Sequence, residues 1–258
     1  MCLIILSLKT FKDYPFVIAA NRDEFYNRPA QAAAFWNEHP YLLAGKDLKD
    51  GGTWLGITRN GKFAALTNFR DLRNINESAP SRGNLVKNFL INNITAEEYS
   101  EILLSEGRIY NGFNLICGNL KKLFYFSNIN GKVEIINEGI HGLSNHLLNT
   151  NWPKVDSGKK KLKDLLASNH VEANRIFELL YDETPAADNK LPDTGVGIQL
   201  ERLLSPMYIK SEQYGTRCST VILIDKENNV TFAESTYDNV TQKLSKVEFK
   251  FKIDDDHL

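Results

Sequence analysis

The chain has 258 residues, of which 42% are hydrophobic and 24% are charged, so it has enough apolar side chains to bury the core of one domain. Its formal net charge of −1 gives no basic surface for a phosphate backbone, which argues against nucleic acid as a partner. We therefore expect a single domain over residues 1–258 whose partner is a small molecule.

The chain begins with a short apolar segment over residues 2–8, which predicts a buried strand. No basic residue precedes this segment and no small-residue cleavage site follows it, so we expect neither a signal peptide nor an integral membrane segment. The three cysteines, at positions 2, 117 and 218, have no CxxC spacing, which argues against disulfides and a thiolate zinc site. We expect a cytoplasmic protein in which Cys117 and Cys218 are buried in apolar strands.

The next apolar segment, over residues 16–24, ends in the polar cluster Asn-Arg-Asp-Glu at residues 21–24. If this segment forms a hairpin with residues 2–8, facing residues have numbers that sum to about 24. Cys2 then lies opposite Arg22. We therefore expect the thiol and the polar cluster to form one site.

The remaining elements indicate separate groups of strands and helices. In chain order they are a hairpin over residues 53–67, helices over 81–93 and 95–107, a hairpin over 123–136, helices over 153–168 and 171–183, a surface loop over 182–198 and a hairpin over 219–235. Thr95, with Glu98 three residues later, is typical of a capping box. Because strands and helices are segregated more than alternated, the sequence favours an α+β fold.

The position of Cys2 has a chemical consequence. A small residue at position 2 allows removal of the initiator methionine, which would give Cys2 a free α-amine beside its thiol. An α-amine titrates near about 8, so it can act as the base for its own side chain at neutral pH. Arg22 would favour the thiolate, and Asp23 would hold the ammonium form. The alternative interpretation is a buried strand cysteine beside an ion pair.

Six segments of the chain resemble one known family. They are MCLI, ANRDEF, GGTWLGIT, ALTNFRD, HGLSN and YGTRCSTVILI, and they extend from Met1 to Ile224. Together they resemble the NRDE family, which includes the Tango-type transport and Golgi organisation proteins. That family is similar to N-terminal-nucleophile (Ntn) hydrolases, especially the choloylglycine hydrolase and penicillin acylase branch. The resemblance therefore implies a four-layer αββα sandwich in which antiparallel sheets are flanked by helices.

The resemblance also implies a catalytic site of six residues, which are Cys2, Arg22, Asp23, Asn68, Asn145 and Arg217. In this assignment the cysteine is the nucleophile, and the Arg-Asp pair steadies the thiol and the α-amine. The two asparagines border the site and bind the oxyanion, where each amide donor is worth about 3 kcal/mol when well placed. The late arginine faces the nucleophile. The Arg-Asp pair is adjacent here, whereas the hydrolases separate these two residues by two further positions.

Other polar and aromatic residues of the same segments are candidates to contact a substrate. These are Asn21, Glu24 and Trp54. Trp54 follows a glycine pair, and it is either a core residue or a platform for a ligand. For Asn68 and Asn145, a role in turns is the alternative to oxyanion binding, because asparagine favours such positions.

Two functions remain open from the sequence. The first is hydrolysis by Cys2 of a carbon-nitrogen amide bond or a thioester in a small amphipathic substrate, which requires no cofactor. The second is non-catalytic binding and trafficking of haem, acyl-CoA or another lipid in the same pocket, which the resemblance connects with Golgi organisation and secretion. His141 and His146 fit no metal-site pattern, although either could ligate haem iron; a surface position is the plainer interpretation.

Overall fold

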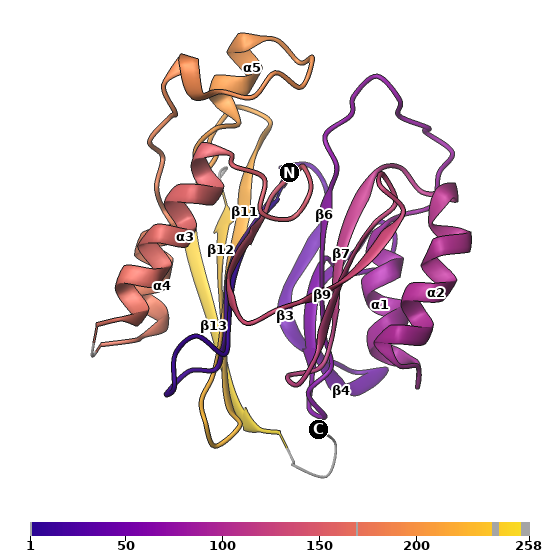
Figure 1. Ribbon diagram of the computed structural model, residues 1–258, viewed down its shortest axis with the longest axis vertical. Helices are drawn as coiled ribbons and strands as arrows, with labels where there is room; N and C mark the ends of the chain where they lie inside the picture. The colour runs from indigo at the N-terminus through magenta and orange to yellow at the C-terminus, as the bar shows by residue number, and fades with distance from the viewer. Residues whose placement is uncertain (1, 169, 239–242, 254–258) are drawn as a thin grey trace.

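The computed structural model describes residues 2–168, 170–238 and 243–253, which form two antiparallel sheets stacked face to face (Figure 1). The first sheet has the order β10-β1-β2-β11-β12-β13, with β1 (Cys2–Leu8), β2 (Phe16–Phe25), β10 (Gly139–Leu143), β11 (Tyr214–Ile224), β12 (Asn229–Asp238) and β13 (Lys243–Lys252). The second runs in chain order, with β3 (Ala30–Trp36), β4 (His39–Asp47), β5 (Leu55–Thr58), β6 (Phe63–Asn68), β7 (Phe113–Gly118), β8 (Leu123–Ser127) and β9 (Lys132–Ile136).

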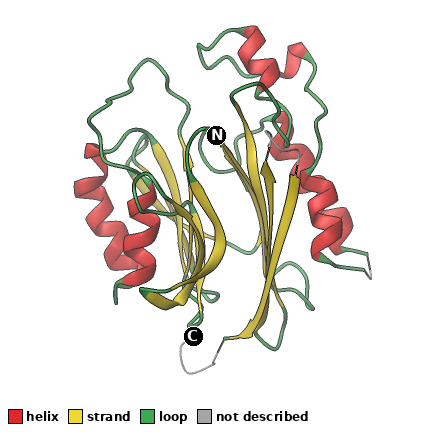
Figure 2. Ribbon diagram, turned by 180° about the vertical axis from the view of Figure 1, so that it is seen from behind, coloured by secondary structure: helices red, strands yellow, loops and turns green. Residues whose placement is uncertain are grey.

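Helices cover the outer faces of the two sheets. They are α1 (Gly83–Ile91), α2 (Ala96–Glu106), α3 (Pro153–Leu166), α4 (Ala173–Leu180) and the short α5 (Ile198–Leu203), with 3-10 turns at Gly107–Ile109 and Asp188–Lys190. Figures 1 and 2 show α3 and α4 against the first sheet and α1 and α2 against the second. The four layers confirm the predicted α+β class and the αββα sandwich. Within the described residues, none of the helices combines the length and apolar character needed to cross a membrane.

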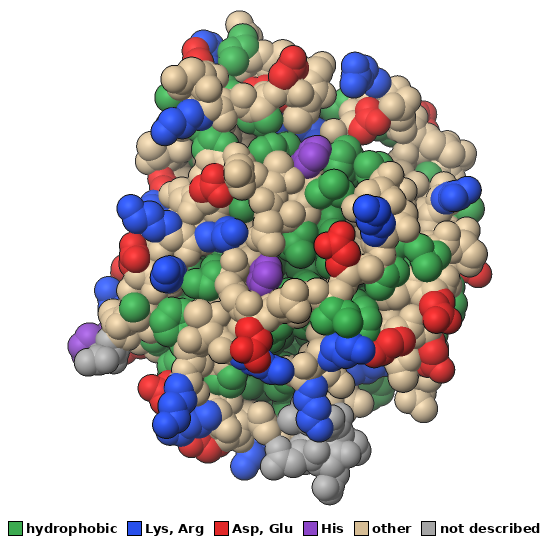
Figure 3. Space-filling model, viewed as in Figure 1, with side chains coloured by type: hydrophobic (Ala, Val, Ile, Leu, Met, Phe, Trp, Pro, Cys, Tyr) green, Lys and Arg blue, Asp and Glu red, His purple; other side chains and the backbone are tan. Residues whose placement is uncertain are grey.

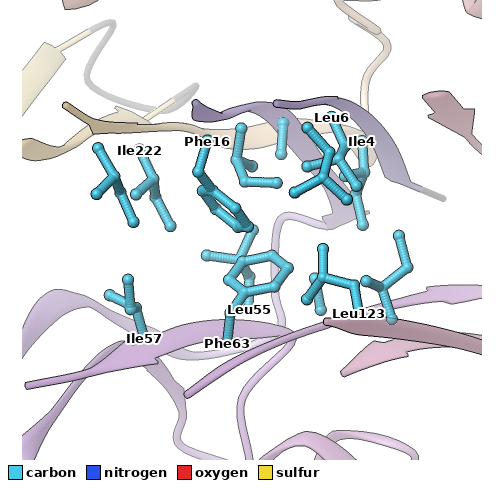
Figure 4. Packing of buried hydrophobic residues seen from close by; sticks show 14 of the residues in the cluster. Ile4, Leu6, Phe16, Leu55, Ile57, Phe63, Leu123 and Ile222 are labelled. Carbon is cyan, nitrogen blue, oxygen red and sulfur yellow. The ribbon is translucent and has the colours of Figure 1, made fainter. Parts of the chain in front are cut away.

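The central core lies between the two sheets (Figure 4). Ile4 and Leu6 point into it from β1, whereas Leu3 and Ile5 pack against the helices on the other side. Because successive side chains of a strand point to opposite faces, a strand buried on both faces has the continuous apolar sequence that begins this chain. The strand that carries Cys2 is therefore an interior strand that is buried on both faces.

Local sequence signals predict many of these elements correctly. Hairpins β5–β6, β8–β9 and β11–β12 occur where they were expected. The capping box at α2 is present, with the Glu98 side chain accepting from the Thr95 N–H at 2.9 Å and the Thr95 hydroxyl accepting from the Glu98 N–H at 3.2 Å. The predicted loop over 182–198 contains only a short 3-10 turn before α5 begins.

The sequence patterns did not predict β3, β4, β10, β13 or α5, whereas β7 is the apolar strand that was expected around Cys117. β4 starts with a His-Pro pair and β10 contains two glycines, so neither has the apolar alternation that reveals a strand. On the face shown in Figure 3, positive and negative side chains are interspersed, in keeping with the net charge of −1.

Candidate active site

Cys2 is fixed by strands on both sides of β1. The predicted hairpin register is confirmed, because Cys2 pairs directly with Arg22 of β2. On the other side, β10 pairs with β1 from Ile4 onward, and Ser144 follows that strand. The Ser144 hydroxyl donates to the Cys2 carbonyl at 3.0 Å. The backbone of Cys2 is thus held within the sheet rather than left on a loose end.

Strand β11 brings further polar groups to the same place through an irregularity in its pairing. Arg22 pairs with Cys218 and Asp23 pairs with Thr216, so Arg217 is an extra residue in β11. A bulge of this kind re-aims the side chain of the extra residue. The Arg217 Nη1 donates to the carbonyls of residues 25 and 28 at 2.8 and 3.0 Å, which fixes its guanidinium beside β2.

A cavity of about 230 Å³ lies at this end of β1. The residues predicted from the sequence that line it are Cys2, Arg22, Asp23, Glu24, Trp54, Asn68 and Arg217. They belong to both sheets and to the loops at their ends, so only the stacking of the sheets brings them together. Two predicted residues, Asn21 and Asn145, do not line the cavity.

Asn21 lies on the opposite face of β2 from the cavity. Its amide nitrogen donates to the carbonyls of Leu180 at 3.0 Å and Met207 at 2.8 Å, and its amide oxygen accepts from the Ser219 hydroxyl at 2.6 Å. The buried side chain is therefore occupied by contacts with the helical layer. This corrects its assignment as a substrate-binding residue, because the alternation along β2 turns position 21 away from position 22.

Asn145 is also buried, behind the wall of the cavity. Its amide nitrogen donates to the Asn68 carbonyl at 2.8 Å, and its own carbonyl accepts from the Arg70 N–H at 2.8 Å. These two bonds connect the end of β10 to the end of β6. Asn145 therefore positions Asn68 and does not itself face the cavity, which corrects its assignment to the oxyanion site.

An ion-pair network that the sequence did not reveal surrounds the Arg22 side chain. The Asp47 carboxylate lies 3.4 Å from Arg22 and 2.5 Å from the Arg28 Nε, and Arg28 also lies 2.6 Å from Asp50. Although burial acts to raise the pKa of Asp47, its hydrogen bond with Arg28 lowers it overall. Glu24 lies 3.9 Å from Arg22 as well, so Arg22 is held by carboxylates from two strands.

Burial controls the ionisation of the Cys2 thiol. It raises the pKa of Cys2, and the Asp23 carboxylate raises it further, while the Asp23 backbone N–H and Arg22 act in the opposite direction. Burial likewise raises the pKa of Asp23. Lys154 and the Thr216 hydroxyl, which donates to the Asp23 carboxylate at 2.7 Å, act to lower this pKa. Arg22 thus acts to lower the pKa of the Cys2 thiol, but its effect does not cancel the increase caused by burial.

Lys154 is a second group that the sequence analysis missed. Its side chain is buried at the start of α3, and its ammonium donates to the Leu204 carbonyl at 2.9 Å. Burial lowers the pKa of Lys154 to about 8, although the carboxylate of Asp23 acts to raise it. The same helix contains several exposed lysines, so nothing in the sequence distinguishes Lys154 as a buried one.

Glu234 is a third missed residue, and it lines the cavity. Its carboxyl group accepts from the Ala33 N–H at 2.7 Å and from the Thr220 hydroxyl at 3.2 Å. Burial raises the pKa of Glu234, which favours the protonated form. In β12, Val230 and Phe232 face the central core, so position 234 continues the inward alternation, and that pattern could have identified it.

The two histidines considered as haem ligands bond to protein atoms instead. The ring nitrogens of His141 lie 2.9 Å from the Asn137 carbonyl and 3.0 Å from the Asn149 amide. His146 contacts the Thr150 hydroxyl at 2.9 Å, and its ring packs against aromatic neighbours. Neither lines the cavity. In the part of the chain that the structure describes, no cluster of His, Cys, Asp or Glu is suited to a metal ion.

We expect iodoacetamide to modify Cys2 before the other two thiols of the folded protein. Cys2 and Cys218 line the cavity, whereas Cys117 is fully buried. Burial raises the pKa of Cys117 to about 12, and burial together with the Glu234 carboxylate raises that of Cys218 well above its usual value. Because the thiolate reacts and the pKa of Cys2 is also raised, the rate at Cys2 should keep rising from about pH 6 to pH 9.

Peptide mapping after timed labelling measures this order, and labelling in denaturant provides the control in which the three thiols react alike. Earlier modification of Cys117 or Cys218, or a rate at Cys2 that levels off below about pH 8, would contradict the prediction.

Comparisons with known proteins identify the family and the fold of the chain. Residues 1–239 match the family described as Transport and Golgi organisation 2. The Transport and Golgi organization protein 2 homologs of Bos taurus and Homo sapiens are 38% and 36% identical over 239 residues, covering 86% of each chain. A mutant conjugated bile acid hydrolase from Clostridium perfringens shares the fold, with a TM-score of 0.53 and 10% identity, over 98% of this chain and 97% of its own. The chain belongs to the Transport and Golgi organisation 2 family.

Proposed function

We propose that the protein is an N-terminal cysteine hydrolase that cleaves an amide bond or a thioester in a small amphipathic substrate. The observation that carries this proposal is the position of Cys2, which is held at the end of an interior strand, in a cavity, opposite Arg22 and beside Asp23. A buried structural cysteine would not need an open cavity or a surrounding set of charged residues. The fold that this chain shares with a bile acid hydrolase supports the proposal.

In the proposed reaction, removal of Met1, which lies outside the described residues, exposes the α-amine of Cys2. The amine takes the thiol proton, and the sulfur attacks the carbonyl carbon of the substrate. A carbon-sulfur bond forms, the bond to the leaving amine or thiol breaks, and the ammonium returns its proton to that leaving group. Water, deprotonated by the same amine, then hydrolyses the acyl-cysteine and restores the thiol.

The neighbouring residues have distinct roles in this proposal. Asp23 holds the ammonium form of the α-amine, and Arg22 favours the thiolate against the effect of burial. Asn68 lines the cavity, and its side-chain amide binds the oxyanion of the tetrahedral intermediate. Asn145 keeps Asn68 in place through the hydrogen bond to its carbonyl.

A carrier that uses the same cavity is the second candidate function. The raised pKa of Cys2 favours it, because a protonated thiol is a weak nucleophile. An acyl chain suits a cavity of about 230 Å³ better than haem does, since sites for drug-sized ligands reach roughly 300 to 1,000 Å³. Neither His141 nor His146 lines this cavity, which also disfavours haem.

Trapping the acyl-enzyme tests the hydrolase proposal directly. The full chain is incubated with acyl thioesters and anilides of six to twelve carbons, quenched in acid and analysed by intact mass and peptide mapping. We expect a chain that starts at Cys2 and gains the mass of one acyl group on that residue. Retention of Met1 in protein from its native host would contradict the mechanism, because the base would be blocked, and would leave the carrier function.

A further inference from the structure

Two of the arginines that line the cavity differ from the others because no ion pair holds them within the described part of the chain. The arginines that line it are Arg22, Arg28, Arg82 and Arg217. Arg22 and Arg28 lie within 4.0 Å of the carboxylates of Glu24 and Asp47. Among the described residues, Arg82 and Arg217 have no carboxylate at ion-pair distance. Because an arginine keeps its charge at any physiological pH, both bring to the cavity a positive charge without a direct ion-pair partner in the described chain, although the carboxyl groups of Asp23 and Glu234 also line it.

Arg82 is the less constrained of these two. Its Nη1 donates to the Gly112 carbonyl at 3.0 Å, and with respect to the described residues this bond leaves the rest of the guanidinium fork available. Arg217 instead uses its Nη1 for two carbonyls of the chain beside β2. Burial lowers the pKa of Arg82, whereas the nearby charges of Glu24 and the Cys2 thiolate act to raise it. The guanidinium is therefore partly desolvated, and it lines the same cavity as the Cys2 thiol.

The backbone next to Arg82 is also tightly placed. The Thr53 N–H donates to the Gly83 carbonyl at 3.2 Å, which joins the start of α1 to the strand entry before β5. Gly52 lies so close that a Cβ there would be 2.5 Å from the Gly83 carbonyl carbon. This packing fixes the position of Arg82 on the wall formed by the second sheet, while Cys2 belongs to the first sheet.

We propose that Arg82 binds an anionic group, a carboxylate or a phosphate ester, on the substrate whose carbonyl meets Cys2. A guanidinium pairs with either group through two parallel hydrogen bonds, and such charge-assisted bonds are about twice as strong as neutral ones. The cavity then orients the substrate between a cation on one sheet and the thiol on the other. This inference deepens the hydrolase proposal, because it specifies an anionic substrate class.

Protection of Cys2 from alkylation tests the inference without requiring turnover. The uncharged reagent iodoacetamide labels the folded full chain in the presence of hexanoate, hexyl phosphate or the neutral hexanamide, and peptide mapping gives the rate at Cys2. We expect at least one of the two anions to protect Cys2 at a concentration about tenfold lower than hexanamide does. The anion that protects better identifies the preferred source, a carboxylate or a phosphate.

Variants of Arg82 test whether this residue causes the stronger protection of Cys2 by anions. Arg82→Gln should remove the advantage of the anions while leaving protection by hexanamide unchanged, and Arg82→Lys should retain part of it because the charge remains. The matched control is Arg108→Gln, which changes an exposed arginine outside the cavity. Equal protection by anions and amide in the wild-type protein, or an unchanged anion advantage in Arg82→Gln, would overturn the inference.

The two proposals fail in different ways. If an anion protects Cys2 better than hexanamide does but no acyl-cysteine ever forms, the anion-binding site is supported and the hydrolase proposal is contradicted. If the acyl-cysteine forms but hexanoate, hexyl phosphate and hexanamide protect Cys2 equally, the hydrolase proposal is supported and the anionic substrate class is contradicted.

Discussion

Replacing Cys2 with alanine is expected to lower the turnover of amide or thioester substrates by at least about 10³-fold, because the nucleophile is lost while the binding residues remain. The side chain is small and lies at the edge of the core, lining the cavity, so the free energy of unfolding should change little. Steady-state turnover and denaturant unfolding of the purified variant measure the two quantities. A carrier would instead bind its ligand equally well with alanine at position 2.

Two matched variants separate nucleophilic chemistry from the shape of the cavity. Cys218→Ala removes the other thiol that lines the cavity, and we expect its turnover to stay close to that of the wild-type protein. Cys2→Ser should retain a small activity, since the α-amine can still activate a hydroxyl. Wild-type turnover in Cys2→Ala, or an equal loss in Cys218→Ala, would contradict the assignment of Cys2 as the nucleophile.

Replacing Glu201 with glutamine is expected to lower the free energy of unfolding by about 3 to 5 kcal/mol, because it removes the negative partner of a buried charge. The Arg70 Nη1 lies 2.5 Å from the Glu201 carboxylate, and the two side chains are only 3% and 4% exposed. The other carboxylate oxygen accepts from the N–H and hydroxyl of Thr194 at 2.9 and 2.6 Å. The pair therefore connects the segment after β6 to α5 and the loop before it.

Denaturant unfolding measures this loss, and a neighbouring ion pair provides the control. Arg202 of α5 pairs with Asp188, but both side chains are about half exposed, so Asp188→Asn should have no measurable effect on stability. Equal stability of Glu201→Gln and Asp188→Asn would show that the buried pair does not hold these segments together.

The sequence by itself determined the elements that depend on near neighbours. The apolar alternation, the Asn-Gly turns and the capping box at Thr95 predict hairpins and helices, because the interactions that form them lie within a few residues. The pairing of Cys2 with Arg22 also follows from the sequence, since a short connector leaves little choice of register. The resemblance to a known family added the αββα arrangement, which the structure and its similarity to a bile acid hydrolase confirm.

Only the tertiary structure decided which polar side chains reach the cavity. Asn21 was expected at the site with Arg22, but the strand alternation turns it toward the helices, where backbone carbonyls occupy its amide. Asn145 was expected to bind an oxyanion, but the stacking of the two sheets places it behind Asn68.

The groups that the sequence analysis missed have the same explanation. Asp47 and Lys154 resemble ordinary surface residues in the sequence, and only contacts with distant segments bury them or give them partners. The alternation along β12 could have identified Glu234 as an inward residue, but its partners come from the distant strands β3 and β11. Arg217 reaches the cavity through a bulge, which exists only when β11 pairs with β2. Local patterns determine where strands and helices form, whereas the direction, burial and charge of a polar side chain depend on residues far away in the chain.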